Sequence, residues 1–126
     1  MKWLQLRTAL AIHRLQIGEH GGEFGVRDFG LLESALARPI NRIEYDPKAD
    51  LASAAAAYAF GISKNHPFID GNKRTSLVAM ETFLRINGFK LKTTPEEKYL
   101  IFIQLAEGTL SEVGLEHWIR DHVKAS

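Results

Sequence analysis

The chain has 126 residues, which favours one domain over residues 1–126 and is long enough for a core that needs no disulfide. It contains no cysteine, which excludes disulfides and thiolate metal sites and fits a reducing compartment such as the cytoplasm. The formal net charge of +1 does not indicate direct binding of nucleic acid, and no apolar run reaches the roughly 18 residues of a membrane span.

The first predicted helix runs from about Trp3 to about Ile17, because apolar residues recur there every three or four positions. A His-Gly-Gly break follows at residues 20–22. His13 lies within the apolar stripe. Two interpretations are open for it: a core histidine whose ring nitrogens find partners, or a residue of a groove that faces a ligand or partner.

The second predicted helix begins after Asp28, whose carboxylate can cap it, and ends at Pro39. From residue 40 to residue 50 the helical periodicity fails. We predict a loop for this segment, in which Ile43 and Tyr45 could form a short extended flap.

An alanine-rich run predicts the third helix, from about Leu51 to about Lys64, because alanine has the best helix propensity and lets neighbouring helices approach closely. Asn65 tolerates the left-handed conformation that often ends a helix, and Pro67 prevents its continuation.

The fourth predicted helix runs from about Asn72 to about Asn87 and carries apolar residues round most of its circumference, as expected for a central buried helix. Gly88 fits the position after its end, and a short extended piece follows at residues 89–92.

Two further helices complete the prediction. One begins at a capping box of Thr94, Pro95 and Glu97 and ends at residues 107–108, and the last covers about residues 112–123. No stretch alternates with period two for long. The predicted fold class is therefore all-α, a compact bundle of about six helices.

Nine consecutive residues, 66–74, have the greatest density of chemical groups in the chain, with the sequence His-Pro-Phe-Ile-Asp-Gly-Asn-Lys-Arg. His66 is a candidate general base, since its ordinary pKa lies near neutral pH. Asp70 is a single hard oxygen ligand, and Mg²⁺ is usually held by one carboxylate together with phosphate oxygens and water. Phe68 is best placed to anchor the loop in the core.

The second half of this motif opens the fourth predicted helix. Gly71 lets the backbone approach a ligand closely, and the free N–H groups near Asn72 suit phosphate. Lys73 adds a point charge and Arg74 adds a planar fork that matches phosphate. The group therefore indicates transfer of part of a nucleotide's phosphate chain to a hydroxyl. The competing interpretation is a surface helix start with a few charges around it.

The nine residues resemble the signature of the Fic/Doc family, His-x-Phe-x-Asp/Glu-Gly/Ala-Asn-Gly/Lys-Arg, and the resemblance covers nearly the whole chain. It implies a compact α-helical bundle and transfer from a nucleotide to a hydroxyl of a target protein. By motif position it implies that His66 is the general base on a Ser or Thr of the target. It further implies that Asp70 holds magnesium and that residues 71–74 bind phosphates.

Two positions are similar to the Doc, or death-on-curing, branch of the family. AMP-transferring members usually have Gly where this chain has Lys73, and a second Arg where it has Leu77. The resemblance to Doc implies a kinase-like toxin that passes the terminal phosphate of ATP to translation elongation factor Tu and stops protein synthesis. AMP transfer to a protein hydroxyl and an inactive binding module of the same fold are the alternatives.

No Ser/Thr-x-x-x-Glu-Gly/Asn inhibitory segment is found, because Ile103 stands where Ser or Thr is needed before Glu107-Gly108. Resemblance to the Doc branch then implies a separate inhibitor, a small Phd-like antitoxin whose disordered C-terminal segment folds into a groove on the toxin. His13 and the first helix are candidates for lining that groove.

Overall fold

The computed structural model describes residues 1–126, and its elements confirm the prediction of an all-α bundle. Its helices are α1 (Leu6–His20), α2 (Phe29–Tyr45), α3 (Leu51–Asn65), α4 (Asn72–Ile86), α5 (Pro95–Glu107) and α6 (Glu112–His122). Two three-residue strands, β1 (Phe89–Leu91) and β2 (Val123–Ala125), form a small antiparallel sheet. None of the six helices combines the length and apolarity that a membrane span requires.

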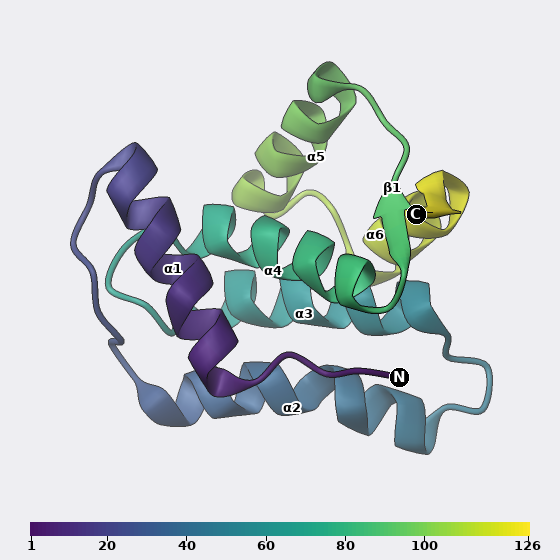
Figure 1. Ribbon diagram of the computed structural model, residues 1–126, viewed down its shortest axis with the longest axis horizontal. Helices are drawn as coiled ribbons and strands as arrows, with labels where there is room; N and C mark the ends of the chain where they lie inside the picture. The colour runs from purple at the N-terminus through teal and green to yellow at the C-terminus, as the bar shows by residue number, and fades with distance from the viewer.

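Helix α3 is the centre of the bundle, and α2 and α4 run along it on either side (Figure 1). Eleven of its fifteen residues are buried, because small alanines let the neighbouring backbones come close. The expectation that the fourth helix is the central one needs correction. Leu77 and Val78 of α4 are only half-buried, because they line a pocket between α4, α1 and α5, and Ile86 near the end of α4 is exposed.

The first helix begins at Leu6, later than predicted, because the residues before it pack in an extended conformation. Trp3 stacks on Phe83 of α4 with ring centres 5.8 Å apart. The N–H of Leu4 donates to the hydroxyl of Tyr58 in α3 over 3.0 Å. The contacts of Trp3 and Leu4 with α4 and α3 therefore stabilise the extended conformation more than continuation of the helix to Trp3 would.

Helix α2 continues through Pro39 to Tyr45, so the predicted stop at Pro39 and the predicted loop or flap at residues 40–45 are wrong. A proline inside a helix costs about 3 kcal/mol. Contacts across the bundle offset that cost. Pro39 itself is buried, and the Arg42 guanidinium one turn later donates to Glu116 of α6 over 2.9 Å.

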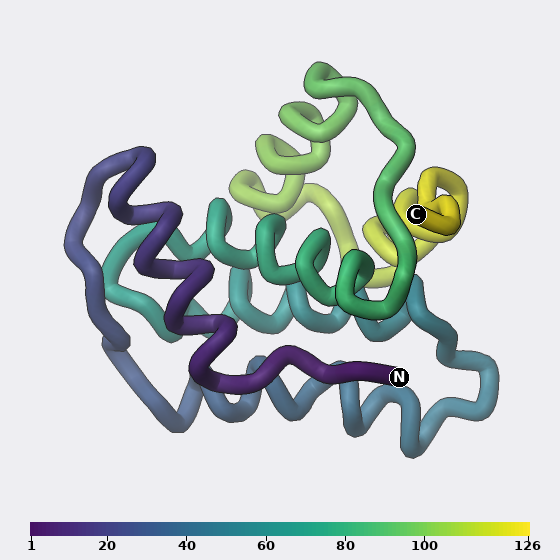
Figure 2. The backbone as a smooth tube through the Cα atoms, viewed as in Figure 1, coloured from purple at the N-terminus to yellow at the C-terminus, as the bar shows by residue number.

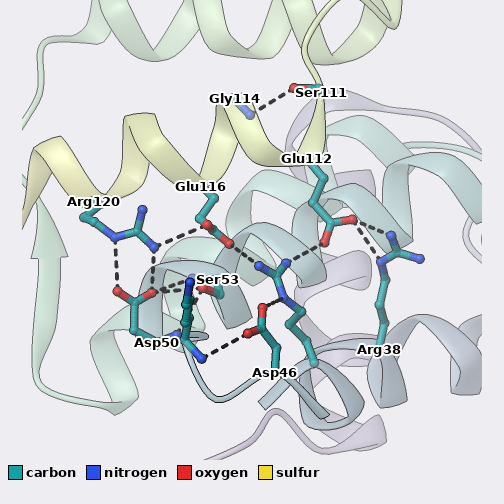
Figure 3. A network of polar contacts seen from close by, with 11 residues as sticks. Arg38, Asp46, Asp50, Ser53, Ser111, Glu112, Gly114, Glu116 and Arg120 are labelled. Carbon is teal, nitrogen blue, oxygen red and sulfur yellow. Dashed lines mark hydrogen bonds and ion pairs between the residues drawn. The ribbon is translucent and has the colours of Figure 1, made fainter. Parts of the chain in front are cut away.

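An ion-pair network joins α2, α6 and the start of α3 (Figure 3). We call the side chains of Arg38, Arg42, Asp46, Asp50, Glu112, Glu116 and Arg120 the α2–α6 network. Asp50 caps α3 by accepting from the N–H of Ser53 over 3.0 Å and also accepts from the Arg120 guanidinium over 3.0 Å. This pairing holds the pKa of Asp50 at about 2, chiefly through the hydrogen bond from Arg120.

The C-terminal half follows the prediction up to its last residues. Thr94 caps α5, Pro95 occupies its first position, and Gly108 ends it with a φ of +77°. The extended piece after Gly88 is β1. Its partner β2 was not predicted, and the predicted last helix ran one residue too far, into Val123, because a three-residue strand has no periodicity to detect.

Candidate active site

The loop between α3 and α4, residues 66–71, lies at one end of the bundle beside the segment that joins α1 to α2 (Figure 2). The backbones pair in an antiparallel way at Val26 and Phe68. The N–H of Arg27 donates to the carbonyl of Pro67 over 2.7 Å, and the N–H of Ile69 donates to Gly25 over 3.0 Å. The motif is thus held by backbone bonds on one side.

Phe68 and Asn72 fix the loop on the other side. Phe68 is 1% exposed and belongs to the main core cluster. The Asn72 side-chain oxygen accepts from the N–H of Phe68 over 2.9 Å, and its amide nitrogen donates to the Phe68 carbonyl over 3.0 Å. The amide oxygen and one of the two amide hydrogens are therefore committed to the protein, while the backbone N–H of Asn72 lies in the first turn of α4, where it suits an anion.

His66 ends α3 in the left-handed conformation, with φ +49° and ψ +54°. The sequence placed this conformation at Asn65, but the Asn65 amide donates to Leu31 of α2 over 3.0 Å. The Arg27 guanidinium donates to the carbonyls of His66 over 2.8 Å and Asn65 over 3.0 Å. A left-handed non-glycine residue costs on the order of 1–3 kcal/mol, and these bonds compensate for it.

The ring of His66 lines a pocket of about 310 Å³, which we call the His66 pocket. It lies between the end of α3, the start of α4 and the α5–α6 turn, and is lined by Phe60, Ser63, Lys64, His66, Lys73, Leu105, Ala106, Gly108, Leu110 and Ser111. The Nζ of Lys73 is 2.8 Å from Nε2 of His66. Burial, and then the charges of Lys73 and Arg27, lower the pKa of His66 below its ordinary value, so the ring is neutral at pH 7.

Helices α1 and α4 begin without a side-chain cap, whereas α2, α3, α5 and α6 each begin with one. Gly71 precedes α4 with a φ of +72°, and a Cβ there would lie 3.2 Å from the Cδ1 of Ile17. Glycine at this position therefore avoids both backbone strain and a clash with α1. The N–H groups of the first turn and the positive end of the helix dipole suit an anion.

Asp70 contributes one carboxylate at the rim of the loop. Its Oδ2 accepts from the N–H of Glu23 over 2.8 Å, which orients the group. No group of three or more His, Cys, Asp or Glu side chains converges anywhere in the structure. Asp70 is therefore an isolated carboxylate, and one carboxylate is the usual protein contribution to a Mg²⁺ site in which phosphate and water complete the shell.

Arg74 points into a second pocket of about 220 Å³, away from the lining of the His66 pocket. Its side chain is exposed, and the guanidinium carbon lies 5.6 Å from the ring centre of Phe102 in α5. Lys73 and Arg74, adjacent in sequence, thus serve different pockets at the start of α4.

His13 is fully buried, so the expectation that it lines a groove for a partner is corrected. Its Nδ1 is 3.3 Å from the Thr75 hydroxyl, and Nε2 accepts from the N–H of Gly25 over 3.4 Å. The ring stacks on Phe68 with centres 3.9 Å apart. It is a core histidine with both nitrogens partnered, and burial lowers its pKa.

Two residues at this end were not singled out from the sequence. Arg27 clamps the carbonyl of His66, and Lys64 lines the His66 pocket. Arg27 is distant from the motif in sequence, and Lys64 has the position of an ordinary basic residue in the last turn of a helix. No local pattern distinguishes either of them.

A family model described as the Fic/DOC family matches residues 3–84, which contain the motif and helices α1 to α3. The chain belongs to the Fic/DOC family. The matched residues of this Fic/DOC protein include the motif 66–74, which forms a loop held on both sides and contributes His66 and Lys73 to one pocket and Arg74 to another.

Several curated Fic/DOC relatives are similar over most of the chain. The chain is 38% identical to "Toxin Doc" of Mycolicibacterium smegmatis, covering 83% of this chain and 77% of that protein. It is 33% identical to "Protein kinase doc" of Escherichia phage P1, covering 76% of each. It is 30% identical to "Protein adenylyltransferase Fic" of Drosophila ananassae, covering 82% of this chain but only 24% of that longer protein.

Proposed function

We propose that this Fic/DOC protein is a toxin that transfers the γ-phosphate of ATP to a Ser or Thr hydroxyl of translation elongation factor Tu and so blocks translation. Family membership and two relatives named as a Doc toxin and a Doc kinase support a toxin with transferase activity. Lys73 and Leu77, which resemble the Doc branch, favour phosphate transfer within the family.

The observation that carries the proposal is the His66 ring, which faces an open pocket at the uncapped start of α4. In the proposed step, Nε2 of His66 takes the proton of the target hydroxyl. The hydroxyl oxygen forms a bond to the γ-phosphorus, and the bond from that phosphorus to the bridging oxygen of ADP breaks. The products are a phosphoester, ADP and a proton on His66. A positioned base of this kind contributes typically 10²–10⁴-fold in rate.

The phosphates are positioned by cations and by backbone N–H groups. Lys73 reaches the His66 pocket, and the first turn of α4 offers N–H groups from Asn72 onward. Arg74 is exposed and has only the Phe102 ring as a partner, so its fork can turn to the phosphate tail. Catalysis of phosphoryl transfer is mostly this positioning and charge stabilisation.

Asp70 would hold Mg²⁺ through its carboxylate, with phosphate oxygens and water as the other ligands. The residue fits this role because a backbone bond from Glu23 already orients one carboxylate oxygen. Bound magnesium would neutralise charge on the phosphate chain.

AMP transfer to a protein hydroxyl is the second candidate, because the Drosophila relatives are named as adenylyltransferases. A catalytically inactive binding module is a third, and the presence of His66, Asp70 and Arg74 argues against it. Incubation with elongation factor Tu and ATP labelled at either the α or the γ phosphate separates these candidates. We expect label in the factor only from the γ position. Label only from the α position would show AMP transfer, and no label from either would contradict both transfers.

We further propose that residues 1–126 act as one domain in the cytoplasm, restrained by a small Phd-like antitoxin with a disordered C-terminal segment. The relative named "Toxin Doc" supports such a pair. Co-expression of the gene with a short neighbouring reading frame should restore growth and yield a stoichiometric complex. Growth that depends on no second protein would contradict this pairing.

A further inference from the structure

The contact between Lys73 and His66 fixes the chemical state of the proposed base. The ammonium of Lys73 has only hydrogens to offer, so over 2.8 Å its Nζ donates and Nε2 of His66 accepts. The proton of the neutral ring is then on Nδ1. The lone pair that would receive a hydroxyl proton is the one that Lys73 engages.

The surroundings of His66 contain cations and no carboxylate. Lys73 contacts the ring from α4, and Lys64 lines the same pocket from α3. Arg27, from the segment before α2, bonds the His66 carbonyl, and its charge also acts on the ring. The pocket residues contributed by α5 and the α5–α6 turn have no charged side chain. None of these three cations forms an ion pair, so an anion that enters the pocket meets no competing carboxylate.

We propose that the ammonium of Lys73 occupies Nε2 of His66, and so prevents it from accepting a proton, until the phosphates of a bound nucleotide bind that ammonium instead. We call this role of Lys73 the guard. The inference deepens the proposed function, on which it rests. Lys73 is thus a positioning residue that ties the readiness of His66 to the presence of the phosphate donor.

The exchange is favourable because a phosphate oxygen is a stronger partner for an ammonium than a neutral imidazole is. Both bonds are charge-assisted through the ammonium, but only the phosphate carries an opposite charge, so Coulomb attraction strengthens its bond to Lys73 further. The lysine stem is flexible, and the free N–H groups at the start of its own helix place the phosphates within its reach. Loss of the ammonium and arrival of negative charge both raise the affinity of His66 for a proton at the moment when it must accept one.

Nitrogen NMR of the histidine rings tests the guard without any transfer assay. The protein has five histidines, and His66→Gln assigns the signal. In the wild type without added anion we expect Nε2 unprotonated, Nδ1 protonated, and a titration midpoint below the ordinary histidine value. In Lys73→Met, which keeps a long side chain without the charge, the midpoint rises. Lys64→Met is the matched control, because it removes a charge from the same pocket but no bond to the ring, and its midpoint moves less.

Inorganic tripolyphosphate is the probe for the exchange. On binding, followed by the backbone amide signals of Gly71 and Lys73, it should raise the His66 midpoint in the wild type and raise it less in Lys73→Met. The guard is overturned if wild type and Lys73→Met titrate alike, if Nε2 carries the proton of the neutral ring, or if tripolyphosphate fails to bind or binds without changing His66.

Kinetics give an independent readout. The acid limb of kcat/KM reports the free enzyme and that of kcat reports the complex. In the wild type the acid limb of kcat/KM should lie at lower pH than the acid limb of kcat, because Lys73 lowers the pKa of His66 only in the free enzyme. In Lys73→Met the two acid limbs should lie at more similar pH. Lys73→Met should also raise KM for ATP about tenfold or more, as loss of a charge-assisted bond does. If Lys73 only bound phosphate, its replacement by Met would raise KM for ATP but would not shift the acid limb of the kcat/KM profile. Absence of any transfer would contradict the proposed function and leave the NMR test of the guard intact.

Discussion

Two ends of the molecule are rich in charge, and they differ in how the cations are partnered. In the α2–α6 network every arginine meets a carboxylate: Arg38 meets Glu112, Arg42 meets Glu116, and Arg120 meets Asp50 (Figure 3). At the motif end the cations meet no carboxylate. Arg27 binds two carbonyls, Lys73 binds an imidazole, and Arg74 lies over an aromatic ring.

The difference indicates what each set of charges is for. Paired ions on two helices hold those helices together, and here they help α2 to continue beyond Pro39. Cations that have no carboxylate partner contribute little to the free energy of folding, and around a pocket they remain available to bind an anion. The comparison therefore supports the proposed binding of phosphates at the motif end, and it indicates a structural function for the network.

The largest expected effect is that of removing the base. His66→Ala should lower phosphate transfer about 10²- to 10⁴-fold, because no other side chain in the pocket can take the hydroxyl proton. Transfer of γ-label to elongation factor Tu measures it. His117→Ala, which changes an exposed histidine of α6, is the matched control and should transfer like the wild type. Equal loss in both variants would contradict the role of His66.

A smaller effect is expected from breaking the network. Glu116 is 8% exposed and bonds Arg42 and Arg120, so Glu116→Ala should lower the free energy of unfolding by about 1–3 kcal/mol. Urea unfolding measures it, with Glu33→Ala on the exposed face of α2 as the control, for which about 0.5 kcal/mol or less is expected. Transfer activity of the folded variant should be retained. A stable but inactive Glu116→Ala protein would contradict the division between the two ends.

The smallest effect is expected at Asp50. Asp50→Asn keeps a capping residue for α3 but loses the ion pair with Arg120, which is half-exposed and so contributes up to about 1 kcal/mol. The folded pKa of Asp50, about 2, lies below its ordinary value of 3.8. The pair therefore stabilises the protein above about pH 4, and this stability is lost as pH falls towards 2. The free energies of unfolding of the wild type and Asp50→Asn, measured between pH 2 and 6, should become more similar as the pH falls to 2. A difference that stays constant over this range would show that the ion pair is not its cause.

Much of the fold follows from local sequence, and the failures share one cause. The limits of α3, α4 and α5 follow from alanine content, apolar period and capping residues. The continuation of α2 through Pro39 depends on bonds to α6, more than seventy residues away in sequence. Strand β2 similarly exists because β1 is beside it. Contacts between distant segments overrode the local signal in each case.

The candidate site shows the same limit. The sequence identifies the reactive side chains of residues 66–74 as a group. It does not reveal that the side-chain amide of Asn72 hydrogen-bonds the backbone of Phe68, or that Lys73 hydrogen-bonds His66. Nor does it reveal that Arg74 lines a separate pocket. These arrangements depend on the left-handed turn at His66, which Arg27 stabilises from another part of the chain.

The most direct test of the account is the affinity for ATP of two arginine variants, one from each end of the molecule. Calorimetric titration of Arg74→Ala should show binding weakened about 10- to 100-fold, as loss of a charge-assisted contact does, at unchanged thermal stability. Arg120→Ala, which removes a paired cation of the network whose partners Asp50 and Glu116 do not line the His66 pocket, should bind ATP like the wild type. Equal weakening in both variants, or full affinity in Arg74→Ala, would contradict the claim that the unpaired cations at the motif end hold the nucleotide's phosphates.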